Sequence, residues 1–169
     1  VTLATAIMYA FAPVSLTALR RVDAERERPY HLPVPSLLSP IAFIAANLII
    51  YWSGFEANWK LLIAMAFGLV LFAITWVATS ADNRPALHLP NFIWVPPWLI
   101  GMTVIGYLGR YGKGSSNVLP DWIDLLVVTG FALVIFFWAV SLAVGSEWVA
   151  GAVDAERDEI EGQPDLAVG

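Results

Sequence analysis

The chain has 169 residues, of which 59% are hydrophobic and 14% are charged, and its formal net charge is −5. Soluble domains usually carry about 25% charged residues, so this composition indicates a chain whose main solvent is not water. The absence of cysteine excludes disulfides, thiolate metal sites and cysteine nucleophiles.

Long blocks of the sequence contain no Lys, Arg, Asp or Glu. A helix needs about 20 mostly apolar residues to cross a hydrocarbon core about 30 Å thick. Continuous apolar runs favour helices, because the strands of a membrane barrel alternate instead. The sequence therefore predicts an all-α integral membrane fold. Its membrane part, residues 1–144, has about five transmembrane helices at residues 1–19, 37–54, 60–79, 96–109 and 124–144.

The first predicted span starts at Val1 instead of Met, which predicts a piece of a larger protein. Pro13 should kink this span, and Tyr9, Ser15 and Thr17 make its second half polar. A broken polar helix can border a substrate path, and a kinked structural helix is an equally good interpretation. The next two spans are separated by residues 56–59, a tight hairpin that predicts antiparallel packing.

The fourth predicted span is short for a full crossing, and residues 110–122 after it are Gly- and Ser-rich, which predicts a flexible loop. Asp121 or Asp124 is placed to cap the fifth span. Residues 145–169 hold seven acidic residues and one base, Arg157, which predicts an acidic, disordered tail.

Loop charges predict the orientation, because cytoplasmic loops are enriched in Lys and Arg. The side holding the loop 20–36 and the tail carries Arg20, Arg21, Arg26, Arg28, Arg84 and Arg157. The other side carries Lys60, Arg110 and Lys113. The loop 20–36 and the tail are therefore predicted to be cytoplasmic.

The sequence shows no group of side chains arranged for catalysis, metal binding or proton transfer. No predicted span holds a buried ionisable residue, which argues against a proton-coupling site here. Asn47 is interpreted as a hydrogen bond to a neighbouring helix. His31 and His88 are interpreted as loop histidines, not metal ligands. The sequence predicts no catalytic residue, no metal ligand, no cofactor and no nucleic-acid partner, and it leaves substrate-binding residues unknown. Eight aromatic residues lie near the predicted membrane surfaces, and most of them are interpreted as anchors: Tyr51, Trp52, Trp59, Trp94, Trp98, Tyr107, Tyr111 and Trp122.

One segment resembles a known family. Leu19-Arg20-Arg21, Glu25 and the run Arg28-Pro29-Tyr30-His31-Leu32-Pro33 resemble the loop after helix ten of amino acid–polyamine–organocation (APC) permeases, although Ala24 replaces a usual proline. Ala12-Pro13-Val14-Ser15-Leu16 resembles the end of that helix. Gly106-Tyr107-Leu108-Gly109 and Leu119-Pro120 resemble the end of bacterial members with fourteen helices.

The resemblance implies the end of helix ten through helix fourteen of a LeuT-like secondary amino acid transporter in a bacterial plasma (inner) membrane. Its coupling would be cation symport or exchange, and its amino acid would bind in the missing part of the chain. The partners would be the lipid bilayer and the remainder of the transporter, and the chain would not be an enzyme. The alternative is a complete small membrane scaffold or subunit without transport activity.

Overall fold

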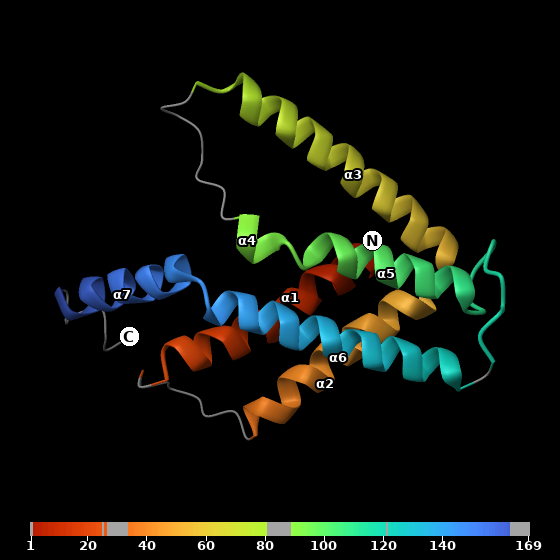
Figure 1. Cartoon of the computed structure of the whole chain (residues 1–169), viewed down its shortest axis with the longest axis horizontal. Helices are drawn as coiled ribbons and strands as arrows, with labels where there is room; N and C mark the ends of the chain where they lie inside the picture. The colour runs from red at the N-terminus through yellow and green to blue at the C-terminus, as the bar shows by residue number, and fades with distance from the viewer. Residues whose placement is uncertain (1, 25, 27–33, 81–88, 121, 163–169) are drawn as a thin grey trace.

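A computed structural model describes residues 2–24, 26, 34–80, 89–120 and 122–162, and these residues form helices and no strand. The helices in chain order are α1 (Thr2–Val22), α2 (Pro35–Trp52), α3 (Phe55–Ala78), α4 (Leu89–Phe92), α5 (Val95–Leu108), α6 (Ile123–Val144) and α7 (Glu147–Gly162) (Figure 1). Five stretches are long and apolar enough to cross a membrane: α1, α2, α3, α4 with α5, and α6. The prediction of an all-α fold with five such helices is confirmed.

The packed body consists of α1, α2 and α6, and α5 lies against α2 and α6 (Figure 1). A cluster of aromatic rings joins these helices, with neighbouring centroids 5.2–5.9 Å apart. Its members are Phe11, Phe43, Trp94, Trp98 and Phe136. Such ring pairs contribute about 0.5–1.5 kcal/mol each beyond the area they bury.

Burial divides seven of the eight predicted aromatic anchors into two groups, and Tyr111 is intermediate between them. Tyr51, Trp94 and Trp98 are buried in the core, so the prediction that they are interfacial anchors is wrong. The anchors that keep an exposed ring are Trp52, Trp59, Tyr107 and Trp122. Both groups lie near helix ends, where position in the sequence does not say which way a ring points.

Helix α3 diverges from the body, as Figure 1 shows. Its membrane-length window buries none of its residues, whereas the other four windows bury a third or more. The turn before it consists of Ser53 and Gly54, and Gly54 has φ +86°, a conformation that favours glycine. The root of α3 lies against Gly106 of α5, which lacks the Cβ that would contact Asn58. The predicted antiparallel packing of α3 on α2 is therefore wrong, because α3 packs mainly on α5.

The two ends of the bundle are distinct (Figure 1). We call the end with the α2–α3 turn and residues 109–122 the hairpin end. The end with α7 and the last turn of α1 is called the tail end. At the hairpin end, residues 109–122 include ordered backbone: the Ser116, Asn117 and Val118 N–H groups donate to carbonyls of residues 107–109. The prediction of a flexible loop is wrong for these residues.

α1 continues as one helix through Pro13, whose carbonyl accepts a hydrogen bond from the Thr17 hydroxyl at 2.9 Å. A continuous helix can still bend at a proline, so the kink at Pro13 stays a prediction. The predicted disordered tail is a helix, α7, over Glu147–Gly162. The Ser146 side chain satisfies the start of α7 by accepting from the Val149 N–H.

Candidate functional site

A buried polar pair joins the second half of α2 to the first turn of α5. The Trp98 indole Nε1 donates to Asn47 Oδ1 at 2.7 Å, and Asn47 Nδ2 donates to the Phe43 carbonyl at 2.8 Å. Both side chains are fully buried. The interpretation of Asn47 as an interhelical hydrogen bond is confirmed, and its amide groups are already engaged, so they are not free to bind a ligand.

A second buried cluster lies at the hairpin end. Asp124 is completely buried in the first turn of α6. Its Oδ2 accepts from the Tyr51 hydroxyl at 2.7 Å and lies 3.2 Å from Arg110 Nε. Its Oδ1 accepts from the Leu125 N–H at 2.8 Å. The prediction that no span holds a buried ionisable residue is therefore wrong for Asp124.

The partners of Asp124 define what it does. A buried carboxylate is costly unless it is paired and hydrogen-bonded, and this one has a cation and two donors. Asp124 also does not make the predicted side-chain cap, because the residue before α6 is Trp122 and has no side-chain cap bond. Asp121 lies outside the described residues. The cluster thus ties α2, α6 and the α5–α6 connection together.

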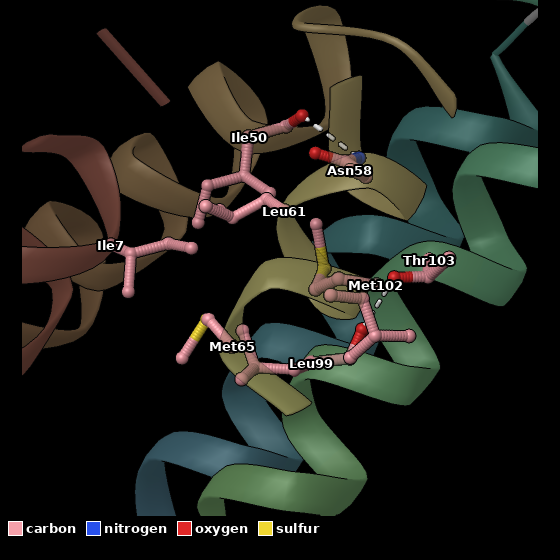
Figure 2. Close-up of a pocket in the computed structure, with 9 residues that line it drawn as sticks. Ile7, Ile50, Asn58, Leu61, Met65, Leu99, Met102 and Thr103 are labelled. Carbon is pink, nitrogen blue, oxygen red and sulfur yellow. Dashed lines mark hydrogen bonds between the residues drawn. The ribbon is translucent and has the colours of Figure 1, made fainter. Parts of the chain in front are cut away.

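Figure 2 shows a small cavity at the root of α3. It has a volume of about 10 Å³, and its lining comes from α1, α2, α3 and α5. Asn58 is its main polar side chain: Nδ2 donates to the Ile50 carbonyl at 3.2 Å, and Oδ1 is buried with no partner. A space of this size holds about one water molecule. It is too small for an amino acid.

A larger groove of about 280 Å³ lies at the tail end between α1, α6 and α7. Its lining is apolar except for Ser15 and Glu156. An amino acid ligand needs convergent donors for its carboxylate, and this lining does not supply such a set. In the described ranges, no group of three His, Asp or Glu residues could hold a metal ion. His31 and His88 lie outside the described residues.

The polar residues of α1 separate into two faces. Thr17 and Pro13 are buried in the bundle, whereas Tyr9 and Ser15 are exposed. The exposed residues recur at spacings of three and four, as one side of a helix requires. Before the terminal arginines they are Ala4, Met8, Tyr9, Ala12, Ser15, Leu16 and Leu19, which we call the α1 stripe. The described part of the chain leaves this stripe uncovered.

These features define a class: a multi-pass helical membrane protein whose buried polar groups serve packing. Comparison with known proteins is more specific. The chain is 26% identical over 169 residues to the glutamate/serine transporter AimA of Bacillus subtilis (strain 168), covering all of this chain and 31% of that protein. It is 30% identical over 134 residues to the aspartate-proton symporter of the same organism, covering 79% of this chain and 26% of that protein. No family profile and no solved structure matches the chain.

The chain is homologous to these two APC-type amino acid transporters and corresponds to a fragment of them, in agreement with the resemblance in its arginine-rich loop. It spans less than a third of the length of either relative. Sequence reasoning missed the grouping of Tyr51, Arg110 and Asp124, which lie up to 73 residues apart in the chain. The available signal was Asp124 itself, an acid at the very start of an apolar block.

Proposed function

We propose that this chain is the supporting, C-terminal part of a secondary active amino acid transporter in a bacterial cytoplasmic membrane. Transport would be coupled to a cation, as symport or exchange, and the amino acid would bind in a part of the transporter outside these 169 residues. The observation that carries the proposal is the similarity to two amino acid transporters along 79–100% of this chain. The chain itself would not be an enzyme.

The structure supports a supporting role for these residues. The Asn47–Trp98 pair and the Tyr51–Asp124 pair are hydrogen-bonded within the bundle, and the larger groove does not gather donors for an amino acid. The α1 stripe is a ready surface for the remainder of the transporter, because it combines apolar residues with Tyr9 and Ser15. α3, which is mostly exposed beyond its first turns, suits contact with lipid.

The proposed topology places the loop 20–36 and the tail in the cytoplasm. The charge bias supports it, since six of the nine Lys and Arg residues lie on that side. Because the chain has no cysteine, a single Ser36→Cys substitution gives an unambiguous probe. A membrane-impermeant maleimide should label Cys at this position only after the membrane is opened. Labelling of intact cells would contradict the topology.

Uptake measurements test the function. The full protein encoded by the reading frame that contains this chain is reconstituted in proteoliposomes. Uptake of labelled glutamate, serine and aspartate is then measured with and without ion gradients. We expect saturable uptake that a gradient drives and that dissipating the gradient removes. The competing proposal, a small membrane scaffold, predicts no uptake and self-association through small residues such as Ala64 and Gly68, which are exposed on α3.

A further inference from the structure

An ion-pair network joins the tail helix to the end of α1. The Arg157 Nη2 atom lies 2.6 Å from Asp23 Oδ1, and Arg26 Nη2 lies 3.0 Å from Glu156 Oε1. Arg26 Nη1 is also 3.8 Å from Asp23 Oδ2. Two adjacent residues of α7 thus pair with Asp23, which directly follows α1, and with Arg26, which lies slightly further along, across 130 or more positions of sequence.

The members of this network differ in exposure. The Asp23 side chain is only 6% exposed, whereas those of Arg157, Arg26 and Glu156 are 43–55% exposed. A buried carboxylate needs its partner, so Asp23 makes α7 docking depend on Arg157. The hydrogen bond from Arg26 to Glu156 raises the pKa of the Arg26 guanidinium, so this group stays charged. The outer pair adds little by itself because it is solvated.

The rest of the α7 contact is thin. Among residues 147–158 of α7, Val153 is the buried apolar residue, and it lines the 280 Å³ groove together with Ala18 and Leu19 of α1. Polar, sparsely packed elements open at a lower free energy than the core of a fold. Once α7 leaves, Asp23 regains water, which reduces the electrostatic cost of leaving. A contact of this kind can open while the packed core of the bundle stays folded.

We propose that α7 is a reversible latch on the tail end of α1, held closed by the Arg157–Asp23 pair. The closed latch fixes the last turn of α1 and the start of the α1–α2 connection. The open latch exposes Val153 and the groove residues. The latch does not depend on transport. Its effect on uptake, by limiting how α1 moves, rests on the proposed function.

Cysteine accessibility tests the latch directly on this cysteine-free chain. Val153→Cys reports docking, and Ala155→Cys, at an exposed position of α7, is the matched control. In membranes opened to both sides, a maleimide should label position 153 slowly and position 155 quickly. Arg157→Gln or Asp23→Asn should raise the rate at position 153 about tenfold or more and leave position 155 unchanged.

Combining the two substitutions distinguishes a specific pair from general damage. Because both residues act as one unit, the double variant should label position 153 no faster than the faster single variant. Lys60→Gln, which removes the exposed Lys60–Glu56 pair at the hairpin end, should change nothing. Unchanged labelling in both single variants, or a multiplied rate in the double variant, would overturn the latch. Absence of uptake in the unaltered protein as well as in all variants would instead count against the proposed function.

Discussion

Asp124→Asn tests whether the buried carboxylate holds the hairpin end together. The substitution keeps the side-chain size but removes the charge that pairs with Arg110 and accepts from Tyr51. Breaking a fully buried pair costs about 3–5 kcal/mol. Arg110 is a third exposed and recovers hydration when its partner is removed. We therefore expect Asp124→Asn to lower the free energy of unfolding by about 2–3 kcal/mol. Tyr51→Phe leaves the ion pair in place and removes one hydrogen bond to a charged group, for about 1.5 kcal/mol.

The assay is detergent-induced unfolding in mixed micelles, followed by helical circular dichroism. Lys60→Gln is the matched control, because its ion pair with Glu56 is exposed and should contribute less than about 1 kcal/mol. The expected order of destabilisation is Asp124→Asn, then Tyr51→Phe, then the control. If Asp124→Asn proves as mild as the control, the cluster does not stabilise the fold and the interpretation fails. A higher stability of Asp124→Asn would show that burying the charge costs more than its partners return.

Two further substitutions test the packing of the bundle. Asn47→Leu should destabilise the fold by about 1–2 kcal/mol, because it leaves the buried Trp98 indole N–H without an acceptor; the same unfolding assay would refute this with a neutral result. Gly101→Ala should cost about 1–3 kcal/mol, since an added Cβ meets the Phe131 ring, whereas Gly68→Ala adds a methyl group where no atom lies within 4 Å and should stabilise α3 by up to about 1 kcal/mol. Equal effects at the two glycines would contradict the described contact between α5 and α6.

The sequence predicted what depends on long runs of one residue type. Charge-free blocks locate the five membrane-length helices, because the length of such a run is itself the physical requirement for crossing a bilayer. The amide of Asn47 was also predictable in role, because a polar group inside an apolar helix must find a partner. Neither inference needs to know which helices are neighbours.

What the sequence did not predict depends on distant contacts. Trp94 and Trp98 have the residue type and the position near a helix end that are typical of interfacial anchors. Only the packing of α5 on the body makes them core residues. Asp23 and Arg157 each resemble an ordinary surface charge until the chain brings them within 2.6 Å. The acidic segment after α6 looked disordered because its charges were counted alone, without the arginine and the aspartate of the α1 end that pair with it.

The location of the substrate site is the central claim, and ligand-induced stabilisation tests it most directly. Thermal unfolding of the 169-residue chain, and of the full protein encoded by the reading frame that contains it, would be followed with glutamate, serine or aspartate added. A ligand at 100 times its Kd stabilises the protein that binds it by about 2.7 kcal/mol. The account predicts a stabilising shift for the full protein with at least one amino acid, and none for the chain alone. A shift of the chain alone would place the amino acid site within these residues and contradict the account.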